Sequence, residues 1–221
     1  SPRLAAARGA HDAARYSSMI DWGLRLVLLF ALPCAVALLV FSRPLVETLF
    51  HYGRFSAHDA SQVTRSLMGY GLGLLGLVAI KVLAPAYFAK GDMKTPVKIA
   101  VVVLIFTQIL NYLLVPHLQH AALTLSISLG ASLNAAWLLT GLIRKGSYSP
   151  QPGWGKTIAQ IVLATAVLGA GLWGVQQYID WGSLHALWRV AYLLATIAAV
   201  GLVYFACLAL LGFPVRQMMR R

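Results

Sequence analysis

The stretch KVLAPAYFAKGDMKTPVKIA (Lys81–Ala100) contains the end of one apolar segment, a short charged turn and the start of a second apolar segment. The apolar residues continue well beyond both ends of this stretch. A helix that crosses a lipid bilayer needs about 20 consecutive, mostly apolar residues, and both segments approach that length. The stretch therefore predicts two membrane-spanning helices joined by a tight turn.

Apolar runs of this kind recur along the whole chain. Of the 221 residues, 59% are hydrophobic and 11% are charged, whereas about a quarter of the residues in a soluble domain are charged. The runs do not alternate as barrel strands do, and a helix satisfies its own backbone groups in lipid. We therefore predict an all-α, polytopic transmembrane bundle of about six helices, near Ile20–Phe41, Val63–Ala89, Val97–Val115, Ala121–Ile143, Ile158–Tyr178 and Leu187–Gly212.

The net charge of +12 indicates membrane topology rather than binding to nucleic acid. If the helices alternate in direction, 12 of the 18 Lys and Arg residues fall on one side, and the opposite loops hold only Arg43 and Arg54. The basic side contains the N-terminal segment, residues 90–98, residues 144–156 and the C-terminal tail. Because basic loops stay in the cytoplasm, both termini are predicted to be cytoplasmic.

The spans divide the chain into five regions. A cytoplasmic segment (1–19) precedes the four-helix part of a lobe (20–144), and a cytoplasmic linker (145–157) leads to a terminal hairpin (158–212) and a basic cytoplasmic tail (213–221). The linker overlaps GSYSPQPGWG, which is rich in turn-forming residues. The opening SPRLAAARGAHDAARYSS has neither an initiator Met nor a signal-peptide pattern. We therefore expect the C-terminal part of a longer protein.

Lys81 is a cation deep within a predicted span. It precedes Lys90 by nine residues, or roughly 13 Å of helix rise. Pro85 has no N–H, so the carbonyl of Lys81 loses its usual helical partner and a kink is predicted. A charge at this depth is costly unless it faces a wet cavity or a partner. Two interpretations stay open: Lys81 lines a polar cavity, or backbone carbonyls and water hold it at the kink.

The charged turn starts the next helix with groups that favour anions. Thr95 suits the N-cap and Pro96 the first helical position, so Lys94 and Lys98 lie at the positive end of the helix dipole. Asp92 is expected to cap or pair locally. These residues are candidates for an anionic head-group site or a cytoplasmic gate, and the alternative is a loop that only sets topology: Asp92, Lys94, Thr95 and Lys98.

Polar side chains also lie in other spans. Arg25 follows Asp21 by four residues, a spacing that predicts a local ion pair. Polar groups within spans usually face the bundle interior, where hydrogen bonds between helices contribute about 0.6 to 2 kcal/mol each. Bonding between helices is therefore the simpler interpretation, and a substrate cavity is the alternative. The candidate cavity residues are Lys81, Arg25, Gln108, Asn111 and Asn134.

Three positions are candidate hinges. Pro33 lies in mid-span and frees the carbonyl of Leu29, as Pro85 frees that of Lys81. Gly73 follows Gly69 by four residues and forms a face of small residues that lets two helix backbones approach closely. Static packing and sliding during a conformational change are both compatible with this pattern.

No catalytic or metal-binding constellation is predicted. The outer loop carries His51, His58 and Asp59, but their spacing matches no standard ligand pattern and an exposed loop is expected. The chain has no Walker loop, HExxH or CxxC motif, and no ionisable groups gathered at one depth as a membrane enzyme requires. We predict that the protein is not an enzyme.

Several stretches resemble one family. KVLAPAYFAKGDMKTPVKIA, DWGLRLVLLFALPCAVALL, LFHYGRFSAHDA, TQILNYLLVPHLQHAALTLSISLGASLNA and SPQPGW are similar to the MurJ (MviN) lipid II flippases of the multidrug/oligosaccharidyl-lipid/polysaccharide exporter superfamily. The resemblance implies fourteen transmembrane helices, with this chain at helices nine to fourteen. It also implies transport of an undecaprenyl-pyrophosphate-linked peptidoglycan precursor across the bacterial cytoplasmic (inner) membrane, from the inner to the outer leaflet, by alternating access.

The same resemblance implies the partners. They are membrane lipid, the undecaprenyl-linked precursor and the missing N-terminal half of the protein, which carries the family's head-group arginines. It implies no cofactor, only coupling to the membrane potential or to a monovalent cation at an unknown site, and a lipid-tail groove at the terminal hairpin. The alternative functions are export of another polyprenyl-linked saccharide and a non-transporting membrane scaffold for cell-wall assembly.

Overall fold

The computed structural model describes residues 2–220, and every regular element in them is a helix. This confirms the predicted all-α class. The helices are α1 (Pro2–Val40), α2 (Ser42–Phe50), α3 (Ala57–Gly71), α4 (Leu74–Ala89), α5 (Lys94–Leu118), α6 (His120–Arg144), α7 (Trp154–Tyr178), α8 (Ala186–Leu210) and α9 (Val215–Met219).

The described helices supply the predicted number of spans. Five of them, α1, α5, α6, α7 and α8, are long and apolar enough to cross a membrane, and α3 with α4 makes a sixth span that bends by 42°. The sequence predicted one continuous helix from residue 63 to 89. The break occurs at Leu72 and Gly73, where Gly73 leaves the helical conformation with φ −109° and ψ 4°.

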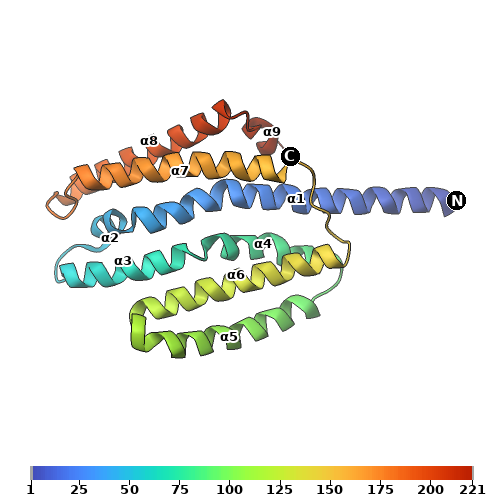
Figure 1. Cartoon of the computed structure of the whole chain (residues 1–221), viewed down its shortest axis with the longest axis horizontal. Helices are drawn as coiled ribbons and strands as arrows, with labels where there is room; N and C mark the ends of the chain where they lie inside the picture. The colour runs from blue at the N-terminus through green and yellow to red at the C-terminus, as the bar shows by residue number, and fades with distance from the viewer. Residues whose placement is uncertain (1, 221) are drawn as a thin grey trace.

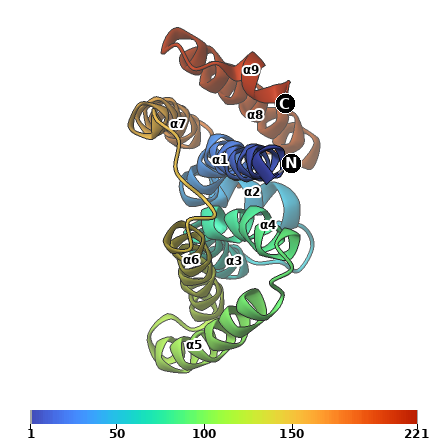
Figure 2. The same cartoon turned by 90° about the vertical axis from the view of Figure 1, so that its right-hand side faces the viewer.

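α1 is the central element of the bundle. The hairpin of α7 and α8 lies on one side of it, and α3, α4, α6 and α5 follow in turn on the other side (Figures 1 and 2). One buried cluster joins α1 to the hairpin through Leu29, Ile161 and Tyr204. A second cluster joins α1 to α4 and α6 through Ile20 and Tyr87, among others. α1 therefore packs against both the terminal hairpin and the group of α3, α4, α5 and α6.

The loops sort to two ends of the bundle. The beginning of α1, the α4–α5 turn, the α6–α7 linker and α9 lie at one end, and α2, the α5–α6 turn and the α7–α8 loop lie at the other (Figure 1). The four basic segments thus share one end, as alternating helix directions require. We call it the basic end, and the opposite one the outer end.

Small residues bring α3 and α4 against α6. A Cβ atom added to Gly69 would lie 2.6 Å from Thr124 Oγ1, and one added to Gly73 would lie 2.2 Å from the Cα of Ser128. The Ser128 hydroxyl donates a hydrogen bond of 2.5 Å to the carbonyl of Gly69. The predicted face of small residues is confirmed as a packing surface, and α6 is the helix that it approaches.

Candidate functional site

Lys81 lies on a face of α4 that no other described helix covers. Its side chain is exposed, as are those of Pro85 and Phe88, which follow at helical spacing on the same face. The neighbouring residue Val82 points instead toward α1, where its Cγ1 would lie 2.8 Å from a Cβ added to Gly23. Among the described residues Lys81 has no hydrogen bond or ion pair. α4 thus presents a cation and a helix-disrupting proline outward, at mid-span.

The turn before α5 differs in detail from the prediction. Thr95 is not the N-cap, because the helix begins at Lys94 with Met93 at the N-cap position, and the side chain that bonds the first turn is that of Asp92. Its carboxylate accepts hydrogen bonds from the Thr95 amide (3.0 Å) and hydroxyl (2.6 Å), and it pairs with Lys145 (3.3 Å). The Thr95 donors, helped by Lys145, lower the pKa of Asp92 to about 2. Lys94 and Lys98 are exposed beside this turn.

The predicted ion pair between Asp21 and Arg25 is present, with Nε 2.7 Å from Oδ2. The sequence did not reveal that the linker closes over it. The other carboxylate oxygen, Oδ1, accepts hydrogen bonds from the Tyr148 hydroxyl (2.6 Å), the Trp154 indole (2.7 Å) and the Gln151 amide (3.1 Å). Burial and the bond to Asp21 raise the pKa of Tyr148, so its phenol stays a donor.

Arg25 completes this contact, which we call the linker node: Asp21, Arg25, Tyr148, Gln151, Trp154 and Thr157. The guanidinium donates to Thr157 Oγ1 at 2.7 Å and to the carbonyls of Gln151 and Pro152 at 3.4 and 3.2 Å, and it lies 4.6 Å from the Trp154 ring centroid. Its donors thus face Asp21 on α1, the linker and the start of α7. Arg25 therefore fastens the start of α7 to α1 and does not join Lys81.

The amide candidates lie on other helices. Gln108 on α5 is exposed, and Asn111 on α5 and Asn134 on α6 are half-buried. α5 packs along α6, with Thr107 Oγ1 2.2 Å from a Cβ added to Gly130. Two buried oxygens at this contact, Asn111 Oδ1 and Ser126 Oγ, have no hydrogen-bond partner among the described residues. The structure does not bring these groups together with Lys81.

The hinge candidates occupy three different settings. Pro33 is buried inside the continuous helix α1, and the Leu29 carbonyl that it frees accepts a hydrogen bond of 2.6 Å from the Tyr204 hydroxyl of α8. Pro85 lies inside α4, and Gly73 stands at the 42° bend. The proline in α1 therefore ties this helix to the terminal hairpin.

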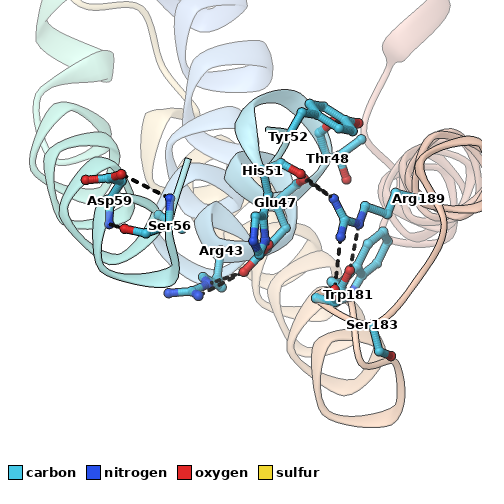
Figure 3. A network of polar contacts seen from close by, with 12 residues as sticks. Arg43, Glu47, Thr48, His51, Tyr52, Ser56, Asp59, Trp181, Ser183 and Arg189 are labelled. Carbon is cyan, nitrogen blue, oxygen red and sulfur yellow. Dashed lines mark hydrogen bonds and ion pairs between the residues drawn. The ribbon is translucent and has the colours of Figure 1, made fainter. Parts of the chain in front are cut away.

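A polar network at the outer end was missed by the sequence analysis (Figure 3). His51 was expected in an exposed loop, but it follows directly on α2, and Glu47 of that helix is buried. Its carboxylate accepts from Arg43 Nε at 2.8 Å and contacts His51 Nδ1. The four-residue spacing of these three residues was the available signal.

Arg189 is the second missed residue. It is buried in α8, and its guanidinium donates to four backbone carbonyls: Glu47 (3.2 Å), His51 (2.9 Å), Trp181 (2.9 Å) and Gly182 (2.9 Å). We call this set the outer clamp, because it joins the end of α2 to the α7–α8 loop. No side-chain pattern could have revealed it, since all four acceptors belong to the backbone.

No metal centre is found in the described residues, which contain no group of three His, Cys, Asp or Glu side chains able to hold an ion. Two of the residues considered have local partners instead. Asp59 caps α3 by exchanging hydrogen bonds with Ser56, and His58 contacts Gln62.

Comparisons with known proteins agree along nearly the whole chain. The model of the family described as "Lipid II flippase MurJ" matches residues 2–192. The lipid II flippase MurJ of Burkholderia cenocepacia is 45% identical over 100% of this chain, which covers 43% of that relative. The probable lipid II flippase MurJ of Haemophilus influenzae is 32% identical over 92% of this chain, which covers 40% of it. The chain thus spans about two fifths of the length of these curated relatives.

Proposed function

The chain belongs to the MurJ family of lipid II flippases, and from that premise we propose that it forms the C-terminal half of such a flippase. The whole protein moves undecaprenyl-pyrophosphate-linked peptidoglycan precursor from the inner to the outer leaflet of the bacterial cytoplasmic membrane by alternating access. The family is one of transporters rather than catalytic enzymes. We assign the basic end of the bundle, with both chain ends, to the cytoplasm, because basic segments are retained there.

The main observation in support of this proposal is the exposed Lys81 on the uncovered face of α4. A charged side chain at mid-span is unfavourable against lipid and marks a substrate or ion pathway when it faces water. Lys81 is exposed on the surface of this chain and has no partner among the described residues. A cavity between this face and the remainder of the protein would hydrate the ammonium group and offer a cation to the pyrophosphate. A scaffold without a water path has no use for such a group.

The other predicted elements take supporting roles in this proposal. Exposed apolar side chains on the terminal hairpin, such as Trp173 and Leu202, offer a surface for the polyprenyl chain. Energy comes from the membrane potential or from a monovalent cation. Asn111 is the chain's candidate ligand for that cation, because its buried oxygen lacks a partner among the described residues. Further oxygen ligands would come from the rest of the protein.

Complementation tests the function. In cells depleted of their own flippase, we expect the full-length protein to support growth, and Lys81→Ala to reduce that growth more strongly than Lys81→Arg. Lys156→Ala, which removes an exposed lysine at the start of α7, is the matched control and should be neutral. Growth supported by this chain without the N-terminal half would overturn the assignment of the chain as an incomplete transporter.

Thiol labelling tests the cavity directly. We expect a Lys81→Cys variant of the full-length protein to react with a water-soluble, membrane-impermeant thiol reagent from one side of the membrane. Cys34 and Cys207, together with any cysteine of the N-terminal half, are replaced by Ser beforehand so that only position 81 reports. Absence of labelling from both sides would contradict the cavity.

A further inference from the structure

Two cavities with different walls lie along one face of α1 near the basic end. The first is apolar, has a volume of about 360 Å³ and lies within the spans, with walls that include Leu24 and Leu28 of α1, Ala79 of α4, Ile143 of α6 and Ile158 of α7. It separates the four-helix part of the bundle from the start of the terminal hairpin. No charged residue lines it.

The second cavity has a volume of about 750 Å³ and a mixed wall that includes two lysines, and it lies beside the linker at the basic end; we call it the polar cavity. Ser17 of α1 forms one wall, Lys90 and Lys145 extend from the ends of α4 and α6, and Ser149 belongs to the linker. Pro150 lines both cavities, so they meet at the linker. Ser17 lies seven residues before Leu24, and therefore on the same face of α1.

The charges in the polar cavity favour an anion. Lys90 and Lys145 line it, and no carboxylate does. Lys90 is 4.5 Å from the Tyr16 ring centroid and has no carboxylate within salt-bridge distance among the described residues. Lys145 shares Asp92 with Thr95, whose two hydrogen bonds at 2.6 and 3.0 Å are shorter than the ion pair at 3.3 Å. Both ammonium groups therefore keep capacity for a further acceptor.

We propose that these two cavities together bind one anionic phospholipid, with its phosphodiester between Lys90 and Lys145 and an acyl chain in the apolar cavity. Basic pockets between transmembrane helices at the cytoplasmic surface recognise lipid head groups. Trp154 and Tyr148, which line the apolar cavity, are the amphipathic residue types found at the head-group level of a membrane. The phosphodiester would thus lie at the membrane surface and the acyl chain within the hydrocarbon layer, as in a bilayer phospholipid.

This lipid is distinct from the transported precursor. Lys81, the residue assigned to the transport path, lines neither cavity. The apolar cavity is bounded by four helices and the linker, so it fits part of one alkyl chain. The bound phospholipid acts as a wedge between the four-helix part and the hairpin, at the point where the linker node fastens them.

Lipid retention tests the proposal. The full-length protein is purified in detergent, supplied with equal amounts of phosphatidylglycerol and phosphatidylcholine, and measured by native mass spectrometry. We expect selective retention of phosphatidylglycerol, and about 10- to 30-fold weaker binding in the Lys90→Ala/Lys145→Ala variant, since a lysine near an anionic head group contributes roughly a fivefold change. The control, Arg8→Ala/Lys156→Ala, removes two exposed basic side chains that line neither cavity and should bind as the wild type does.

A second variant tests the tail. Ala79→Phe fills the apolar cavity without changing the charge, and we expect it to weaken phosphatidylglycerol binding while gel filtration and thermal melting report a folded protein. If this variant does not fold, competition with a short-chain phosphatidylglycerol replaces it, and weaker binding of the short-chain lipid is expected. Three outcomes would overturn the proposal. The Lys90→Ala/Lys145→Ala variant could retain as much phosphatidylglycerol as the wild type, or the control could lose as much as that variant. A polyprenyl phosphate could also displace phosphatidylglycerol from the wild type.

Discussion

At the scale of single residues, the linker node shows how a buried carboxylate is made tolerable near a membrane surface. Asp21 faces one guanidinium and three neutral donors, so each of its oxygens is occupied. Such fully paired charges contribute little net stability, but removing one partner leaves the other as an uncompensated buried charge. The cost of breaking the node therefore falls mainly on Arg25, whose remaining donors face only neutral oxygens.

We predict that Asp21→Ala destabilises the protein by about 3–5 kcal/mol, the range observed when one member of a buried ion pair is removed. Thermal unfolding of the detergent-purified, full-length protein measures the change, and Trp154 fluorescence should report a wetter indole. Asp12→Ala is the matched control, because Asp12 is exposed on the same helix. Equal melting temperatures for the two variants would contradict this assignment.

Arg189 gives a second prediction at this scale. In Arg189→Lys a single nitrogen replaces a planar group that reaches carbonyls from two segments, so at least one hydrogen bond from a charged donor is lost. Its loss lowers the free energy of unfolding by about 1.5–3 kcal/mol. We expect faster amide hydrogen exchange in the α7–α8 loop, residues 179–185. The conservative change Arg216→Lys on exposed α9 should leave exchange in that loop unaltered. Unchanged exchange in Arg189→Lys would show that the clamp does not hold the loop.

At the scale of elements, the bend between α3 and α4 is coupled to the contact with α6. Gly73 leaves the helical conformation where its Cα lies against the backbone of Ser128. A side chain here cannot be accommodated by rotation, since the nearest atom is a backbone carbon. The bend and the close approach therefore require the same glycine.

We predict that Gly73→Ala costs about 1–3 kcal/mol through overpacking and reduces complementation. Gly174→Ala in α7 is the control, because nothing lies within 4 Å of its added Cβ, and the higher helix propensity of Ala should stabilise it by up to about 1 kcal/mol. Melting temperatures of the two purified variants separate these effects. A neutral Gly73→Ala would mean that α6 moves away at little cost.

The elements that sequence could predict are those with a local or periodic signal. Hydropathy located the spans, and a four-residue spacing was enough for the pair of Asp21 and Arg25. Thr95 was assigned as a cap because hydroxyl caps are common, but the helix begins one residue earlier, and the Thr95 hydroxyl donates to the carboxylate of Asp92 instead of capping. The outer clamp had no signal, because Arg189 meets backbone carbonyls 138 and 142 residues away in the chain. Contacts of that kind depend on tertiary packing.

At the scale of the whole molecule, α1 shares a buried cluster with each part of the bundle. The linker node, through Thr157 and Trp154 of α7, and the Tyr204–Leu29 hydrogen bond both attach the hairpin to this helix. The hairpin should therefore follow α1 as one body during transport. The linker lies against α1 at Ser17, whose hydroxyl accepts a hydrogen bond of 3.0 Å from the Ser149 amide.

We predict that a disulfide between Ser17→Cys and Ser149→Cys leaves transport intact. The measurement is flipping of lipid-linked precursor by the full-length protein in vesicles, before and after oxidation, with the reduced double variant as the reference. If oxidation stops transport while reduction restores it, the linker must leave α1 during the cycle, and the single-body description is wrong.

The length of α1 has a mechanical consequence. Its 39 residues extend over about 58 Å, nearly twice the roughly 30 Å hydrocarbon thickness of a bilayer. The helical turns before Asp21 therefore continue beyond the span and tilt together with it. A tilt of about 5° in the embedded part displaces Gly9, roughly 18 Å before Asp21 along the helix, by about 1.6 Å. No atom lies within 4 Å of a Cβ added to Gly9, so a spin label fits there. Its displacement would report small tilts of the membrane-embedded part of α1.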